Sequence, residues 1–172
     1  MPRILALDAP GGKIGGWVVV GTLGVSPKDA GKKTCTLLDH GVLLLETQDS
    51  ELSHFTQLHK LLDKLYAKYT FRHIVFEHPF LYRIAQWIGA YKLWVAMHHQ
   101  VRWYMIGASS ARKTVLGAAP KMKAKDAKAL VKARVESYFG IQLTQHEADA
   151  GFYALAFAIK QNWETPLQQE TP

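Results

Sequence analysis

The order of the apolar segments constrains the fold of this 172-residue chain more than any other feature. In the first 45 residues, three short apolar runs are joined by short connections rich in glycine, proline and lysine, which predicts an antiparallel meander. Two later strand-like runs alternate with helical segments, a pattern typical of parallel strands joined by crossover helices. The sequence therefore predicts a mixed five-stranded sheet with helices packed on it. The expected strands are 4–7, 17–20, 36–45 (with a bulge near Gly41), 71–76 and 102–106.

Apolar side chains recur at helical spacing in five further segments. The expected helices are 52–65, 81–99, a short one ending at 117, 123–139, and one from 145 through 159. The expected N-caps are Asp49 or Ser50 for the first helix, Ser109 or Ser110 for the third, and Thr144 for the last. Glu147 stands three residues after Thr144 and matches the capping-box pattern, so we interpret it mainly as the partner of that cap.

Length and charge narrow the class of protein. The length fits one domain, expected over 1–163, with a loose polar tail over 164–172. The net charge of +7 favours a polyanionic partner such as DNA, RNA or an anionic membrane surface. The apolar runs are too short to span a bilayer. Cys35 is the only cysteine, which excludes an internal disulfide and favours a cytosol-like compartment.

Acidic residues follow two of the predicted strands directly. Asp8 ends the first strand and Glu77 ends the fourth, at the edge of the sheet where the active sites of α/β proteins gather. Asp149 lies in the first turns of the last helix, and His146 precedes it by three residues on the same face. Each acid alone is more often a solvated surface residue. If the first and fourth strands are neighbours, however, their carboxylates converge.

Converging carboxylates repel one another unless a cation neutralises them. Oxygen ligands suit Mg²⁺ or Mn²⁺, and two such ions about 3.5–4 Å apart can activate water and stabilise the departing oxygen in phosphodiester hydrolysis. His146 is open to three interpretations: a metal ligand, a general acid or base, or a solvent-exposed residue at the start of a helix.

Four motifs stand in order along the chain. The first is Ile-Leu-Ala-Leu-Asp at 4–8 with Pro-Gly at 10–11, and the second is Val-Phe-Glu-His-Pro-Phe at 75–80. The third is Lys-Thr-Val-Leu-Gly at 113–117 before a lysine-rich helix, and the fourth is His-Glu-Ala-Asp-Ala at 146–150. Together they resemble the RuvC-type Holliday junction resolvases of the ribonuclease H-like superfamily. Ala9 stands between Asp8 and Pro10 where the family usually has Asp-Pro-Gly, which leaves a phage or organellar relative open.

The resemblance implies a ribonuclease H-like mixed sheet with helices on both faces. It also implies a Mg²⁺-dependent endonuclease of DNA recombination and repair that resolves four-way junctions by paired symmetric nicks. Two ions per site are expected, with Mn²⁺ able to substitute. Asp8, Glu77, His146 and Asp149 fall on the family's metal-binding and catalytic positions. The family forms a homodimer, for which the helix 81–99 is the expected interface.

The resemblance also assigns residues to the DNA. Phe80 falls where the family places an aromatic wedge, and Lys113 falls on a basic residue near the scissile phosphate. The basic stretch offers further phosphate contacts, although a solvated helix face is the usual meaning of such a run. Its members assigned to DNA binding are Lys121, Lys123, Lys125 and Lys128.

Two alternative functions stay open. One is a related ribonuclease H-like nuclease acting on flaps, other branched DNA or RNA, and the other is a non-catalytic junction-binding protein. The expected location is the cytosol of a bacterial or phage-infected cell, with an organelle as the alternative. No membrane partner is expected, and the sequence does not identify a branch-migration helicase.

Overall fold

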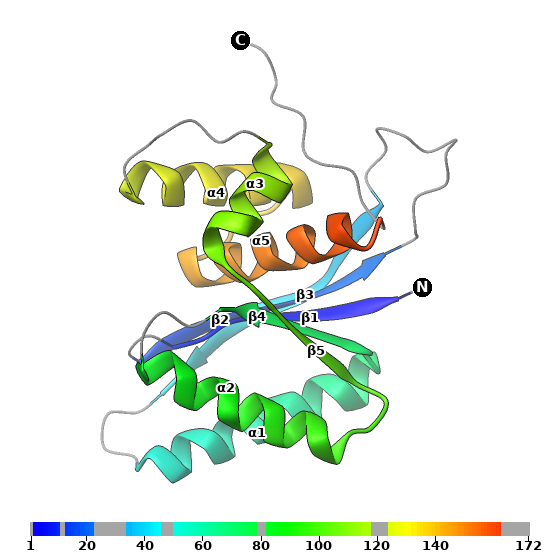
Figure 1. Ribbon diagram of the computed structural model, residues 1–172, viewed down its shortest axis with the longest axis vertical. Helices are drawn as coiled ribbons and strands as arrows, with labels where there is room; N and C mark the ends of the chain where they lie inside the picture. Colours follow the sequence, from blue (N-terminus) through cyan, green and yellow to red (C-terminus); the bar gives the residue numbers. More distant parts are fainter. Residues whose placement is uncertain are drawn as a thin grey trace.

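One mixed sheet organises the protein, which we describe from a computed structural model at residues 2–10, 13–22, 34–45, 50–78, 82–117 and 124–162. The sheet has five strands in the order β3-β2-β1-β4-β5 (Figure 1). Strands β1, β2 and β3 pair antiparallel, whereas β1, β4 and β5 pair parallel, which confirms the predicted topology. The strands are β1 (Arg3–Asp8), β2 (Ile14–Thr22), β3 (Cys35–Leu44), β4 (His73–Glu77) and β5 (Arg102–Ile106).

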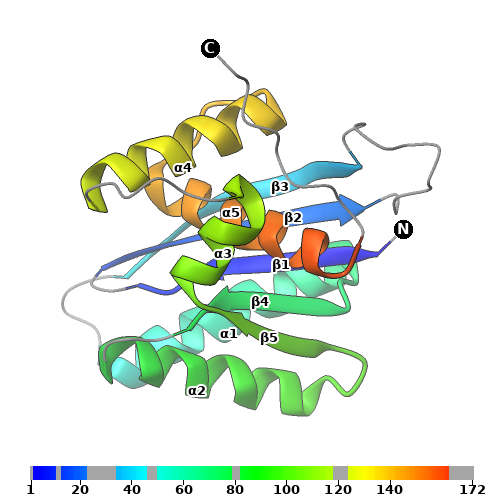
Figure 2. The same cartoon turned by 45° about the horizontal axis from the view of Figure 1, so that its top comes forward.

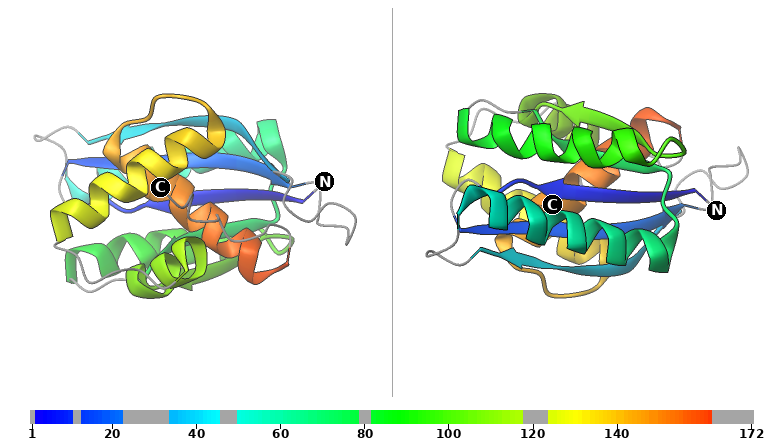
Figure 3. Two further views of the ribbon diagram at one scale, coloured as in Figure 1. Left: turned by 90° about the horizontal axis from the view of Figure 1, so that it is seen from above. Right: turned by 90° about the horizontal axis from the view of Figure 1, so that it is seen from below.

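Helices cover both faces of the sheet. One face carries α1 (Glu51–Tyr69) and α2 (Tyr82–Met97), and the other carries α3 (Ala108–Leu116), α4 (Ala124–Phe139) and α5 (Gln145–Lys160). Figures 1 and 2 show these two layers on opposite sides of the strands, and Figure 3 shows each layer from its own side. No helix in the described part of the chain is long and apolar enough to cross a membrane.

Strand β1 is apolar on both faces because it lies at the centre of the sheet. Ile4 and Ala6 belong to the core shared with α5, and Leu5 and Leu7 belong to the core shared with α1 and α2. All four are buried. This position leaves Asp8, the last residue of the strand, at the boundary between the core and solvent.

Helix α5 lies against the sheet along most of its length, and nearly all its residues from 147 to 158 are buried. A small residue also lets α5 pack closely against α4. A Cβ added to Gly151 would lie 2.8 Å from Val135 of α4. The buried length of α5 therefore holds its first turn firmly over the ends of β1 and β2.

Two local predictions differ from the structure. Helix α3 begins at Ala108 with Gly107 as its N-cap, not with Ser109 or Ser110, because the chain turns directly after β5. The bulge of β3 lies between Leu37 and Asp39, opposite Val19 and Val20 of β2, rather than near Gly41.

Gly41 is a packing position rather than a bulge, and the caps of α1 and α5 match the prediction. A Cβ on Gly41 would lie 2.6 Å from the Trp17 ring, so its lack of a side chain makes room for that indole. Ser50 caps α1 by accepting a hydrogen bond from the Ser53 amide at 3.2 Å, and Thr144 caps α5 as predicted. Asp49 and the tail 164–172 lie outside the described residues.

Candidate active site

Asp8 and Glu77 end neighbouring parallel strands. Leu7 of β1 lies opposite Phe76 of β4, so the next residue of each strand, an acid in both cases, reaches the same edge of the sheet. The Asp8 side chain is only 12% exposed. The predicted convergence of these two carboxylates is confirmed.

The first turn of α5 brings the other two predicted residues to this edge. The Thr144 hydroxyl accepts from the Glu147 amide at 3.3 Å, and the Glu147 carboxylate accepts from the Thr144 amide at 2.7 Å, which completes the capping box. Such caps contribute about 1 kcal/mol to a helix. His146 Nδ1 lies 2.6 Å from Asp8 Oδ2, and Gln145 Nε2 donates to Asp149 Oδ1 at 2.9 Å.

A glycine sets how closely this turn approaches the sheet. Gly16 of β2 pairs with Asp8 of β1, and a Cβ on Gly16 would lie 2.2 Å from the carbonyl carbon and oxygen of His146. The backbone of α5 therefore rests directly on the backbone of β2. This contact places His146 beside Asp8.

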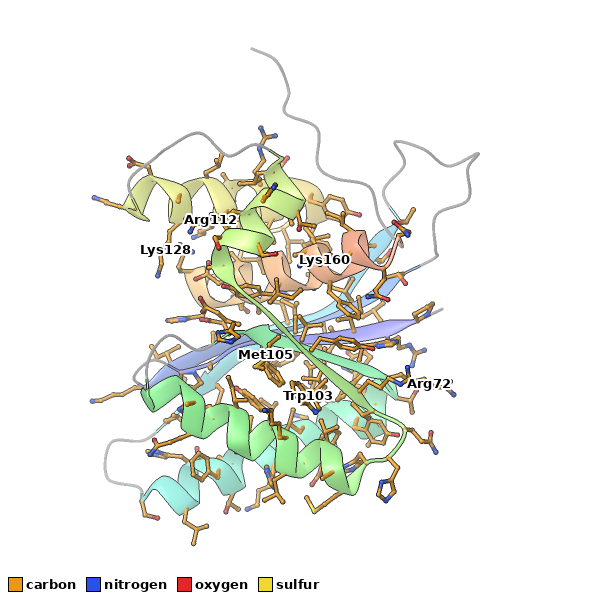
Figure 4. All side chains as sticks on the ribbon, in the orientation of Figure 1. Arg72, Trp103, Met105, Arg112, Lys128 and Lys160 are labelled. Atoms are coloured by element: carbon orange, nitrogen blue, oxygen red, sulfur yellow. The ribbon has the colours of Figure 1, made fainter. Side chains whose placement is uncertain are left out.

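All four predicted residues line one pocket of about 380 Å³. Arg112 of α3 and Lys128 of α4 also line it, and Figure 4 shows these two cations on the same side of the molecule. The full lining is Asp8, Ala9, Glu77, Ala108, Arg112, Ala127, Lys128, Val131, His146, Asp149, Phe152 and Tyr153. An anionic cluster with cations at its side is suited to a phosphodiester and the ions that accompany it.

Burial makes the carboxyl groups of this pocket reluctant to ionise. Burial raises the pKa of Asp8 to about 6, the charges of Asp149 and Glu77 add to the rise, and the His146 hydrogen bond opposes it. Burial also raises the pKa of Asp149, against the opposing effects of Gln145, Lys128 and His146.

Glu77 shows the same effect. Burial raises its pKa, the charge of Asp149 adds to the rise, and a hydrogen bond from the Tyr153 hydroxyl opposes it together with the charges of Lys128 and Arg112. Three carboxyl groups with raised pKa values in one pocket form a site that a cation would stabilise.

The donor set fits a hard divalent cation, since three carboxylates and an imidazole supply oxygen and nitrogen ligands. In the residues that the structure describes, no three His, Cys, Asp or Glu side chains are yet arranged to hold a metal ion. Asp8, Asp149 and Glu77 each bond a protein group instead: His146, Gln145 and Tyr153 respectively. An ionised carboxylate has about four lone-pair positions, so these hydrogen bonds leave others for a cation.

The residues predicted to bind DNA, unlike the four predicted catalytic residues, do not all line the pocket. Lys128 lines the pocket, whereas Lys113 and Lys125 are exposed and are not among the described residues that line it. The other three predicted contacts, Phe80, Lys121 and Lys123, lie outside the described residues.

Two pocket residues were missed by sequence reasoning. Arg112 lies one position before Lys113 and four after Ala108, which also lines the pocket, and Tyr153 lies four after Asp149. Residues four apart share one face of a helix, so this spacing was the available signal.

Comparisons with known proteins agree with this geometry at the level of the fold. No protein-family model matches the sequence, and a search of curated proteins finds no match. A Thermus thermophilus RuvC structure is similar with a TM-score of 0.73 at 20% sequence identity, over 96% of this chain and 99% of that chain. T. thermophilus RuvC in complex with a Holliday junction substrate is similar with a TM-score of 0.71 at 19% identity, over the same shares. The chain therefore has the ribonuclease H-like fold of RuvC, as predicted.

Proposed function

We propose that this protein is a RuvC-type endonuclease that resolves four-way DNA junctions by paired symmetric nicks through metal-dependent phosphodiester hydrolysis. The observation that carries the proposal is the pocket at the ends of β1 and β4, where Asp8, Glu77, His146 and Asp149 meet beside Arg112 and Lys128. The similar fold of a RuvC bound to a Holliday junction substrate supports the choice of substrate.

The four predicted residues would hold the cations, expected to be two Mg²⁺ ions with Mn²⁺ able to substitute. When bound, such ions would activate the attacking water and stabilise the departing oxygen. His146 can hold a proton at Nδ1 toward Asp8, which gives the site a group able to transfer a proton. Arg112 and Lys128 can bind the scissile phosphate and offset its charge.

The exposed basic residues would extend the DNA contact beyond the pocket. Lys125 of α4 and Lys113 of α3 are both exposed, and the net charge of +7 favours a polyanion. Lysines of this kind add affinity without sequence preference. Phe80, Lys121 and Lys123 stay assigned to DNA binding by the resemblance alone.

Paired nicks require two active sites, so we propose a homodimer. Helix α2 carries two large apolar side chains on one exposed stripe, because Leu93 and Met97 are 59% and 58% exposed and four residues apart. An isologous contact through α2 would cover this stripe.

The test compares cleavage of a synthetic four-way junction with cleavage of flap, duplex and RNA substrates, with and without Mg²⁺ or Mn²⁺. We expect symmetric nicks in the four-way junction only when the metal is present. Preferential cleavage of flaps or RNA would show that the four-way junction is not the substrate. Junction binding without nicking under both metals would identify a non-catalytic binding protein.

Asp8→Asn is the variant that tests the mechanism. It keeps the size of the side chain but removes the charge that a cation needs, so we expect cleavage to be abolished while junction binding persists in a gel-mobility assay. Nicking by a pure Asp8→Asn preparation would contradict the proposed mechanism.

A further inference from the structure

The first turn of α5 is fixed at three places across the sheet. His146 contacts Asp8 on β1, and the peptide between His146 and Glu147 rests on Gly16 of β2. The third contact joins Glu147 to His40 on the edge strand β3. Neither His40 nor Glu147 is among the described residues that line the candidate pocket, so this contact acts from outside it.

Both oxygens of the Glu147 carboxylate are engaged. Oε2 accepts from the Thr144 amide at 2.7 Å, and Oε1 lies 2.7 Å from His40 Nδ1, which donates the hydrogen because a carboxylate has none. The Glu147 side chain is 9% exposed and the His40 side chain is 38% exposed. The capping box needs only Oε2, so the bond to His40 is an additional restraint on the same turn.

The bulge in β3 aims His40 at this carboxylate. Before the bulge, Cys35 and Leu37 face the core under α5, and after it Asp39 bonds Tyr69 and Lys68 of α1 on the opposite face. One extra residue reverses which positions face which side. His40 thereby faces α5 from a strand that pairs with β2 rather than with β1.

We propose that His40 is a positioning residue for the nuclease reaction. Its bond to Glu147 fixes the rotation and depth of the first turn of α5, and so presents His146 and Asp149 to Asp8 and Glu77. The contact distance of 2.6 Å between His146 and Asp8 leaves little room for displacement. This inference rests on the proposed function, because His40 would position residues of the site to which that function is assigned.

The test compares three variants of the full chain. His40→Ala removes the donor, and His40→Asn restores one near the place of Nδ1. Asp39→Asn is the matched control, since it removes the acceptor for Lys68 and Tyr69 on the other face of β3, while the remaining Oδ1 can still accept from the His40 amide. The measurements are the single-turnover cleavage rate on the four-way junction, junction affinity, the Mn²⁺ affinity of the DNA-free protein, and the histidine ring NMR signals, assigned with His146→Gln.

In His40→Ala we expect cleavage to slow roughly tenfold to a hundredfold, which is the usual effect of a misplaced catalytic group, with junction affinity unchanged. Mn²⁺ affinity falls and the His146 ring signals move. His40→Asn recovers the rate, the Mn²⁺ affinity and the signals, and Asp39→Asn changes none of them.

Unchanged His146 signals and Mn²⁺ affinity in His40→Ala would overturn the inference, as would an equal loss in Asp39→Asn. These two measurements need no substrate. If the wild-type protein cuts no nucleic acid, they still decide whether His40 positions His146, and the cleavage result counts only against the proposed function.

Discussion

At the scale of single residues, the site depends on a glycine that carries no chemistry. Gly16 allows the His146 carbonyl to approach β2 more closely than any side chain permits, since its absent Cβ would lie 2.2 Å from that carbonyl. The acids of the site were recognisable from the sequence, but the contact that aligns His146 with them was not.

Gly16→Ala should therefore damage both stability and activity. The added methyl group must push α5 away from β2, which we expect to cost about 1–3 kcal/mol of unfolding free energy, as overpacking does elsewhere. Displacement of His146 from Asp8 should slow cleavage by about a hundredfold. Urea unfolding and single-turnover cleavage measure the two effects.

Gly89→Ala is the control for the stability of Gly16→Ala. Nothing lies within 4 Å of a Cβ at Gly89, which is inside α2, so we expect that variant to gain roughly 0.5–1 kcal/mol. Equal stability of the Gly16→Ala and wild-type proteins would contradict the close contact.

Tyr153 is the second residue whose role depends on the pocket. Its hydroxyl donates to Glu77, and the pKa of Tyr153 is raised by burial and by the charge of Glu77. Tyr153→Phe keeps the ring and removes this hydrogen bond, which is of the kind worth about 1.5–3 kcal/mol when one partner is charged. We expect cleavage to slow roughly tenfold to a hundredfold because Glu77 loses the group that holds it.

Tyr138→Phe is the control for that change. Tyr138 also uses its hydroxyl in a buried contact, accepting from the Cys35 amide at 3.1 Å, but it lies outside the candidate pocket. This variant should lose stability and keep its cleavage rate. If both variants lose activity alike, Tyr153 has only a structural role.

At the scale of elements, the edge strand β3 links the two helical layers. On one face His40 bonds Glu147 of α5, and on the other Asp39 accepts from the Tyr69 hydroxyl at 2.7 Å and from Lys68 Nζ at 3.1 Å. Consecutive residues of a strand point to opposite faces, which is why neighbours can serve different helices. The strand thus fixes α1 as well as α5.

The contact between β3 and α1 should make stability depend on pH. Burial alone would raise the pKa of Asp39, but the hydrogen bonds from Tyr69 and Lys68 outweigh it and lower the pKa below its ordinary 3.8. A carboxyl group with a lowered pKa stabilises the fold above its unfolded value, and that contribution disappears as the pH falls through the folded value.

Asp39→Asn should therefore lower the unfolding free energy near neutral pH by less than about 1 kcal/mol, since the pair is partly exposed. The difference from the wild type should vanish well below 3.8. Urea unfolding of both proteins across this range measures it. A difference that grows toward acid pH would contradict the assigned hydrogen bonds.

At the scale of the whole molecule, the proposed reaction needs two sites in fixed relation. The exposed stripe of Leu93 and Met97 on α2 lies on the face of the sheet opposite to α5. A second copy could bind there without covering the layer of α3, α4 and α5 (Figure 1). This arrangement would leave both candidate pockets open to one DNA junction.

If the proposed dimer forms, Leu93→Asp should convert it to a monomer, because the substitution places a charge in the proposed apolar contact. Sedimentation velocity measures the mass, and nicking of a supercoiled cruciform plasmid measures whether the two cuts are still paired. We expect single nicks in place of paired ones. A wild-type protein that sediments as a monomer in the presence of the junction would contradict the dimer.

The sequence by itself determined the order and type of the elements, since the periods of strand and helix are local properties of the backbone. It also indicated that Asp8 and Glu77 lie at the edge of the sheet, because an acid that directly follows an apolar run stands where the buried strand ends. The capping box at Thr144 was equally local, and it fixed where the last helix begins.

Only the tertiary structure decided which basic residue faces the pocket. The rotation of α3 about its axis follows from the burial of Ala111, Val115 and Leu116, and that rotation turns Arg112 inward and leaves Lys113 exposed. The bond between His40 and Glu147 joins residues 107 positions apart, so no local pattern contains it. Side-chain packing sets such rotations and pairings, and packing exists only once the chain has folded.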